Sequence, residues 1–185
     1  MTRAYLESFY GRSVPDLVGP GLRLLFVGIN PGLWTAATGA HFARPGNRFW
    51  PALAAAGITD HLVDASAGMS DADRAHLLAR GVGITNLVAR ATSRADELTP
   101  DEYREGAERL TRNVALWEPA VVAVAGITAY RHGFGRPRAL PGRQPEDVAG
   151  AELWVVPNPS GLNAHATLAS LAAAYREPAE AAGIL

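Results

Sequence analysis

The sequence predicts an α/β protein: a three-layer α/β/α sandwich with a mostly parallel sheet of about four strands. Short apolar runs alternate with longer helix-like segments along the chain, as in parallel sheets covered by helices. The run at 121–126 is almost continuously apolar, which is typical of a strand buried on both faces. With 185 residues, of which 48% are hydrophobic, the chain has the size of a single domain spanning residues 1–185.

The expected strands are short apolar runs bounded by glycine, proline or polar residues. They lie at 23–29, 83–88, 121–126 and 153–156. Because crossovers between parallel strands are right-handed, the carboxyl ends of the strands should share one edge of the sheet. Residues 135–150 contain three prolines and three glycines, so a connecting loop or loose hairpin is expected there.

The expected helices begin at capping residues and end at glycine or proline. They lie at 2–10, 47–56, 71–80, 99–117, 127–133 and 164–176. Ser70 precedes one of them, and the pair Thr99-Pro100 begins another by the cap-then-proline pattern. Residues 1–20 form the N-terminal helix and a connector, and the stretch 35–47 is predicted to be a long irregular loop of the kind that often carries function.

The composition excludes several kinds of chemistry. The chain has no cysteine, which excludes disulfides, thiolate metal sites and cysteine nucleophiles. It also has no lysine, so no side chain can form a Schiff base with a sugar aldehyde. The five histidines are scattered, and we expect no metal and no cofactor. The chain has no run of about 18 apolar residues and no signal-peptide layout, so we expect a cytoplasmic protein without a membrane partner. A monomer is expected from the small size of the chain.

Asn30 is the strongest candidate for a catalytic residue. It follows the first strand in the run Gly28-Ile29-Asn30-Pro31-Gly32, at the edge where open α/β sheets keep their active sites. The proline favours an extended backbone at Asn30, and Gly32 permits a sharp turn. An amide oxygen accepts a hydrogen bond from water while its nitrogen donates elsewhere, so Asn30 is predicted to position a water.

A second loop follows the last strand at the same edge. It reads Pro157-Asn158-Pro159-Ser160-Gly161-Leu162-Asn163. An apolar Leu162 between Gly161 and Asn163, after a stiff proline pair, has the layout of a wedge that enters a duplex in place of a displaced base. The alternative is that Leu162 is an ordinary core contact at a strand-to-helix turn.

Three segments together resemble the mismatch-specific uracil-DNA glycosylases, which include the thymine-DNA glycosylases. They are the run 28–32, Phe42 with the run Arg44-Pro45-Gly46-Asn47-Arg48-Phe49-Trp50, and the run 158–162. The resemblance continues weakly between them from about residue 22 to 176. It implies a uracil-DNA glycosylase-like fold and hydrolysis of the bond between uracil and deoxyribose, opposite guanine in double-stranded DNA.

By this resemblance, Asn30 holds the attacking water and Phe42 stacks on the flipped base. The loop around Gly28 and Ile29 is expected to bind the base, and its backbone N–H groups to stabilise the leaving group. The wedge is Leu162 with Gly161 and Asn163, which contacts the widowed guanine. Loop support is assigned to Pro31, Gly32, Asn158 and Ser160.

Three further positions bear on the chemistry. Asp96 lies in a loop before a helix, where a carboxylate near the sugar would stabilise positive charge; the alternative is a solvated turn aspartate. The chain departs from the family pattern at Trp34 and at Asn86, which replaces a lysine, and both are expected to reshape the pocket. The arginine that many members have after the wedge is missing here, so guanine opposite the lesion is expected to be read less strictly.

Two other functions stay open from the sequence. The first is a DNA-binding module of the same fold that recognises mismatches or abasic DNA without catalysis, against which Asn30 and Phe42 argue. The second is a glycosylase acting on single-stranded uracil, against which the run 160–162 argues. Whether thymine or other modified pyrimidines are accepted depends on pocket width, which the sequence does not give.

Overall fold

The computed structural model describes residues 1–185 and contains a single five-stranded sheet with the order β2-β1-β3-β5-β4. The strands are β1 (Leu24–Gly28), β2 (Val82–Asn86), β3 (Val121–Ala125), β4 (Gly142–Arg143) and β5 (Glu152–Val156). All neighbouring strands are parallel except the short β4, which pairs antiparallel with β5. The predicted mostly parallel α/β sheet is therefore confirmed, and the segment 135–150 forms the loose hairpin through β4.

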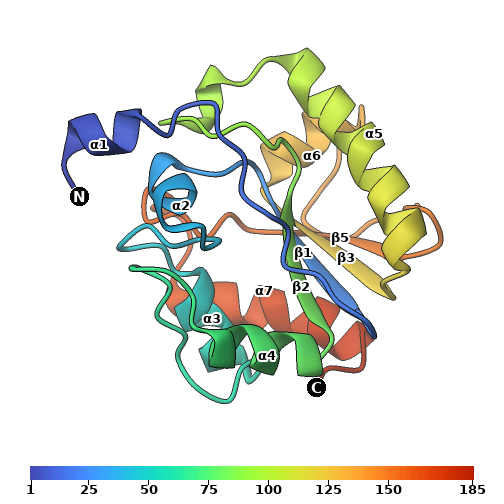
Figure 1. The fold of residues 1–185 in the computed structure, drawn as a ribbon. Helices are drawn as coiled ribbons and strands as arrows, with labels where there is room; N and C mark the ends of the chain where they lie inside the picture. The colour runs from blue at the N-terminus through green and yellow to red at the C-terminus, as the bar shows by residue number, and fades with distance from the viewer.

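Helices cover both faces of the sheet (Figure 1). They are α1 (Arg3–Glu7), α2 (Leu33–Thr38), α3 (Phe49–Ala56), α4 (Asp71–Ala79), α5 (Pro100–Trp117), α6 (Ile127–Gly133) and α7 (Leu168–Ala181), with a 3-10 helix at Ala95–Glu97. The core cluster on one face joins strand residues to α3, α4 and α7, and the cluster on the other face joins them to α5 and α6. This is the three-layer arrangement that the alternating pattern predicted.

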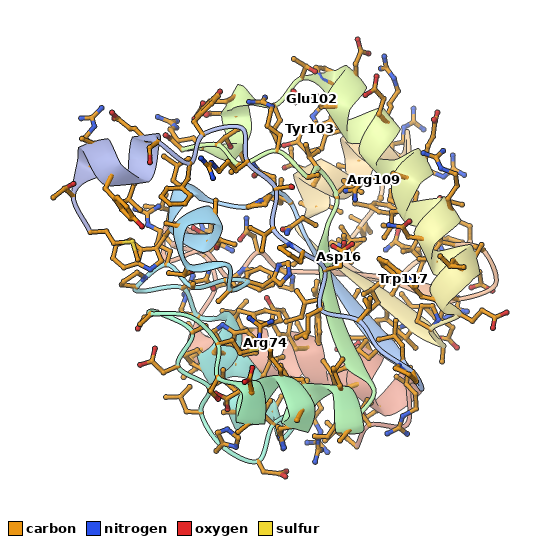
Figure 2. The ribbon with its side chains drawn as sticks, in the orientation of Figure 1. Asp16, Arg74, Glu102, Tyr103, Arg109 and Trp117 are labelled. Atoms are coloured by element: carbon orange, nitrogen blue, oxygen red, sulfur yellow. The ribbon has the colours of Figure 1, made fainter.

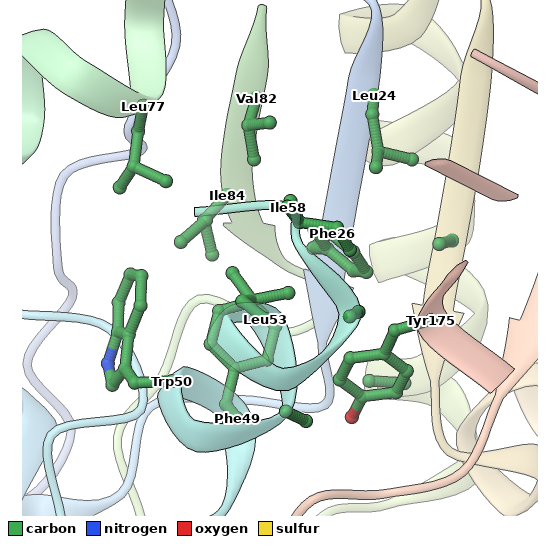
Figure 3. Packing of buried hydrophobic residues seen from close by; sticks show 14 of the residues in the cluster. Leu24, Phe26, Phe49, Trp50, Leu53, Ile58, Leu77, Val82, Ile84 and Tyr175 are labelled. Atoms are coloured by element: carbon green, nitrogen blue, oxygen red, sulfur yellow. The ribbon is translucent and has the colours of Figure 1, made fainter. Parts of the chain in front are cut away.

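Successive residues of the central strands serve opposite faces, which explains their continuous apolar character. Leu24 and Phe26 pack with α3 and α7, where the Phe26 ring meets Phe49 edge-on at 5.3 Å and Tyr175 lies beside both (Figure 3). Leu25 and Val27 pack with α5 and α6 on the other side. The central strands are therefore buried on both faces, as is usual for parallel strands between two layers of helices.

Some element boundaries differ from those expected. The stretch 33–38, predicted to be loop in part, forms α2, whose N-cap is Gly32 and makes no side-chain capping bond. The last helix begins later, because Thr167 caps it through Ser170, and it continues past Pro178 to Ala181. The first helix is shorter than 2–10, ending at Glu7.

The sheet register places the ends of β1 and β2 side by side. Gly28 lies opposite Asn86, and the loops that follow continue the pairing, since the Val88 N–H donates to the Ile29 carbonyl at 2.9 Å. The loops after β1, β2 and β5 therefore meet at one edge. None of the helices is long and apolar enough to span a membrane.

Candidate active site

A cavity of about 150 Å³ opens at the carboxyl edge of the sheet, where these loops meet. Six of the predicted site residues line it: Ile29, Asn30, Gly32, Phe42, Asn158 and Ser160. Asn86, Thr35, Thr92 and Arg44 complete much of its wall. Polar and apolar groups are mixed in this wall, which suits a flat heterocycle with hydrogen-bonding edges.

The Asn30 amide is held by two hydrogen bonds. Its Nδ2 donates to the Arg90 carbonyl at 2.9 Å and to Thr92 Oγ1 at 2.7 Å. The Thr92 hydroxyl in turn donates its proton to the Arg94 carbonyl at 2.8 Å. Both neighbours of the amide therefore act only as acceptors towards it, so the nitrogen, and not the oxygen, must face them. The Asn30 oxygen is left to accept a hydrogen bond from another group.

Phe42 has an unusual backbone conformation and a stacked ring. Its φ is +55°, a left-handed value that non-glycine residues rarely adopt. The ring stacks on Phe49 of α3, with 3.9 Å between centroids and 19° between planes. Because Phe49 covers one face of the ring, a base in the cavity can stack only on the other face. The rare backbone conformation at this cavity is the kind of strain found at binding sites.

Asn86 is the second amide in the cavity wall, and a buried histidine determines its orientation. His41 Nε2 lies 3.0 Å from the Pro15 carbonyl, which can only accept, so this nitrogen carries the proton. Burial lowers the pKa of His41 below its ordinary 6.5, which favours the neutral ring. The other ring nitrogen, Nδ1, is then an acceptor and receives the Asn86 Nδ2 at 3.2 Å. The Asn86 oxygen consequently lies on the opposite side of the amide.

Gly28 makes room for this amide. A Cβ added at Gly28 would lie 2.7 Å from the Asn86 Oδ1 and 3.2 Å from the Phe42 Cζ. Gly28 therefore does not line the cavity itself but lies against two residues that do. The glycine is required here for close approach rather than for a special φ.

Leu162 is exposed on the loop after β5. Its relative exposure is 79%, which excludes the core contact that the sequence left as the alternative. Its N–H donates to Ser160 Oγ at 3.3 Å, and the preceding Ser160 N–H donates to the Asn158 Oδ1 at 2.9 Å. Gly161 is packed so closely that a Cβ would lie 2.8 Å from the Gly46 carbonyl oxygen. The loop thus exposes one apolar side chain on a backbone that is held by hydrogen bonds and close packing.

Arg48 supports this loop from beneath. Its guanidinium donates to the carbonyls of Ser160 and Asn163 at 2.7 and 2.8 Å and also to the carbonyl of Ala166. The Arg48 N–H donates to the Pro159 carbonyl at 3.0 Å. The run 44–50 and the loop 158–163, which are far apart in sequence, are therefore one hydrogen-bonded unit.

Several predicted site residues have supporting positions. Asn163 directs its side chain inward, with Nδ2 donating to the Asn158 carbonyl at 3.0 Å, so its amide braces the loop rather than extending outward. The Pro31 carbonyl accepts the Thr92 N–H at 3.1 Å. Gly32 lines the cavity and begins α2.

Asp96 and Trp34 do not line the cavity. The Asp96 side chain is 62% exposed, and its carboxylate pairs with Arg94 at 2.5 Å. The geometry therefore gives no support to a catalytic carboxylate at Asp96 and matches a solvated turn aspartate. Trp34 packs against the core and donates from Nε1 to the Ser66 carbonyl at 2.8 Å. Because Trp34 does not line the cavity, no direct contact supports its expected effect on the pocket.

The sequence did not identify three residues that shape the site. Arg90 and Thr92 fix Asn30 from about 60 positions away, and the buried His41 orients Asn86. No local pattern marks such contacts, because they join segments that are far apart in the sequence. Those to Asn30 follow from the parallel pairing of β1 and β2. The structure also contains no group of three or more histidine, aspartate or glutamate side chains arranged to hold a metal ion.

Comparisons with known proteins bear on the family and the fold. A family model described as the uracil DNA glycosylase superfamily matches residues 15–179. Among solved structures, the fold is similar to a solution NMR structure of a protein from Methanosarcina acetivorans, assigned as a candidate uracil DNA glycosylase. The TM-score is 0.59 at 17% sequence identity, and the match covers 90% of this chain and 97% of that chain. The chain belongs to the uracil DNA glycosylase superfamily.

Proposed function

We propose that this protein is a monofunctional DNA glycosylase that removes uracil mispaired with guanine from double-stranded DNA. The observation that carries the proposal is the fixed orientation of the Asn30 amide at the cavity. Hydrolysis of the N-glycosidic bond passes through a cation-like sugar, so the reaction needs a placed water and a stabilised leaving group rather than a strong nucleophile. The Asn30 oxygen accepts a hydrogen bond from that water, and this contact directs a lone pair of the water oxygen at the anomeric carbon.

Base recognition is assigned to Phe42 and Asn86. The free face of the Phe42 ring stacks on the extruded base. With its nitrogen committed to His41, the Asn86 amide presents its oxygen as an acceptor. Uracil carries a proton at N3 whereas cytosine carries a lone pair, so an acceptor at this place favours uracil. The same orientation does not by itself exclude thymine, which has the same N3 proton.

Double-stranded DNA is proposed as the substrate because Leu162 is exposed on a braced loop beside the cavity. A protruding apolar side chain fills the gap that an extruded base leaves in a duplex, which lowers the cost of unstacking. Single-stranded DNA needs no such wedge. The backbone of Gly161 and Leu162 is then next to the widowed guanine, while the Asn163 amide holds the loop.

The products proposed are free uracil and an intact abasic strand. A lyase step needs an amine that attacks the sugar aldehyde, and the chain has no lysine side chain. Strand cleavage should therefore appear only after treatment with alkali.

The test is a panel of labelled oligonucleotides with uracil opposite guanine, opposite adenine and unpaired, together with thymine opposite guanine. The proposal predicts the fastest release from the guanine-opposed uracil duplex, with strand breaks only after alkali. Faster release from unpaired uracil would favour the single-strand alternative. Binding to mismatched or abasic DNA without any release would favour the non-catalytic module.

A further inference from the structure

Residues 10–12 lie against the loop that orients Asn30. The family match begins at residue 15, so this N-terminal segment lies outside the matched region. The Gly11 N–H donates to the Ala91 carbonyl at 2.9 Å, and the Ala91 N–H donates back to the Arg12 carbonyl at 2.8 Å. This reciprocal pair joins the segment to the residue between Arg90 and Thr92.

A side-chain network reinforces the same contact. Arg90 forms a bidentate pair with Glu102, from Nε to Oε1 at 2.7 Å and from Nη2 to Oε2 at 3.1 Å. Glu102 stands at the start of α5 (Figure 2) and also accepts the Thr99 N–H at 2.9 Å. Tyr10 completes the network, since its hydroxyl accepts from Arg90 Nη1 at 3.0 Å and its ring centre lies 5.6 Å from the guanidinium carbon.

The charge state of the network is constant near neutral pH. The guanidinium of Arg90, together with the Thr99 N–H, lowers the pKa of Glu102 to about 2. Bidentate arginine–carboxylate pairs are geometrically specific as well as stabilising. The Arg90 side chain is therefore held between the N-terminal segment and α5.

We propose that residues 10–12 form an N-terminal clamp that positions the Asn30 amide through the backbone of residues 90–92. The Arg90 carbonyl and the Thr92 hydroxyl are the two acceptors for the Asn30 nitrogen, and the clamp fixes Ala91 between them. Tyr10 and Arg90 are positioning residues in this account. The inference rests on the proposed role of Asn30 and adds a part of the chain beyond the matched family region.

Tyr10→Ala tests the clamp, with Tyr5→Ala as the matched control. Both tyrosines lie in the first ten residues and both are 50% exposed, but Tyr5 packs edge-on against Phe9 and not against Arg90. On a uracil–guanine duplex at saturating protein, Tyr10→Ala should lower the single-turnover release rate about 5- to 10-fold, as expected for loss of one half-exposed hydrogen bond at a positioning contact. The Kd for the duplex should stay unchanged. Tyr10→Phe, which keeps the ring but loses the hydroxyl, should give an intermediate rate.

A second measurement does not depend on catalysis. NMR measures hydrogen exchange of the Ala91 amide and, in the same spectra, the Asn30 side-chain amide signal. Exchange at Ala91 should be faster and the Asn30 signal altered in Tyr10→Ala, whereas both should be unchanged in Tyr5→Ala. Equal rates and equal exchange in the two variants would overturn the clamp while leaving the proposed function intact. If the wild-type protein releases no uracil, the proposed function fails, and the exchange at Ala91 and the Asn30 signal still decide whether the clamp exists.

Discussion

The contact between Gly28 and Asn86 gives a prediction with a magnitude. In Gly28→Ala, the new Cβ would lie 2.7 Å from the Asn86 Oδ1, whereas an ordinary van der Waals contact begins at about 3.4 Å. The amide oxygen must therefore retreat by several tenths of an ångström, or the ends of β1 and β2 must separate. The Phe42 ring, at 3.2 Å from the same position, limits the room for a compromise.

Overpacking of this kind costs about 1–3 kcal/mol, and replacing a strand glycine by alanine returns about 0.5–1 kcal/mol of backbone entropy. Taking the middle of each range, the net loss is about 1 kcal/mol of unfolding free energy, or a Tm about 2–4 °C lower for a chain of this size. Because Asn86 is displaced as well, the rate of uracil release should fall about 10- to 100-fold, in line with the cost of misplacing a positioning group by up to 1 Å.

Thermal unfolding and single-turnover uracil release measure the two effects. Gly32→Ser is the control for stability, since a Cβ there meets nothing within 4 Å and serine is well accepted at the helix N-cap that Gly32 occupies; it should change the unfolding free energy by less than about 0.5 kcal/mol. In an Asn86→Ala background the clash with the oxygen is gone, so Gly28→Ala should cost about 1 kcal/mol less there. Equal Tm values for the Gly28 and Gly32 variants, with no coupling to Asn86, would refute this reasoning.

Three other predictions test separate parts of the site. Burial lowers the pKa of His41 in the folded state, so the unfolded chain takes up a proton there first as the pH falls below 6.5. The stability that neutral His41 contributes is therefore fully present above that pH and decreases below it. Urea unfolding should show that the difference in unfolding free energy between wild type and His41→Gln depends on pH in this window, and a pH-independent difference would contradict the argument. Arg48→Met removes the charged donor to three carbonyls and should lower the unfolding free energy by about 2–4 kcal/mol, measured by urea unfolding against Arg112→Met on the exposed side of α5; similar losses in both variants would contradict the bracing role. Leu162→Ala should slow uracil release from duplex DNA about 10-fold but leave the release rate from single-stranded DNA within about twofold of wild type, because a base must be unstacked only from a duplex. Equal losses on both substrates would contradict the wedge role of Leu162.

Much of the fold could be predicted because the strands are buried on both faces. Residues 121–125 form a strand with every position buried, and such a run has few alternatives once the neighbouring helix caps are placed. The helix α2 was not predicted, because Gly32 gives no side-chain capping signal and the helix has only six residues. Its Trp34 is held by a hydrogen bond to Ser66, a contact that no local pattern contains. Tertiary contacts therefore decided the element that propensity left open.

The candidate site divides in the same way. Asn30, Phe42 and Leu162 could be proposed because each lies in a short motif with a chemical reason for its residue types. The partners that orient them could not, since His41 and Asn86 are 45 positions apart and Asn30 and Thr92 are 62 apart. Asp96 shows the opposite case, because the sequence supplies a suitable residue type, but the structure gives it an exposed carboxylate that pairs with Arg94 outside the cavity wall.

The most direct test of the account is Asn30→Ala, with release rate and DNA affinity measured on the same uracil–guanine duplex. If the amide oxygen holds the attacking water, the single-turnover rate should fall by at least about 100-fold, because the positioned nucleophile is lost. The Kd should change by less than about twofold, since the wedge loop and the stacking ring of Phe42 are untouched and Asn30 is assigned to the water rather than to the DNA. A rate close to wild type, or a loss of affinity that matches the loss of rate, would contradict the central claim.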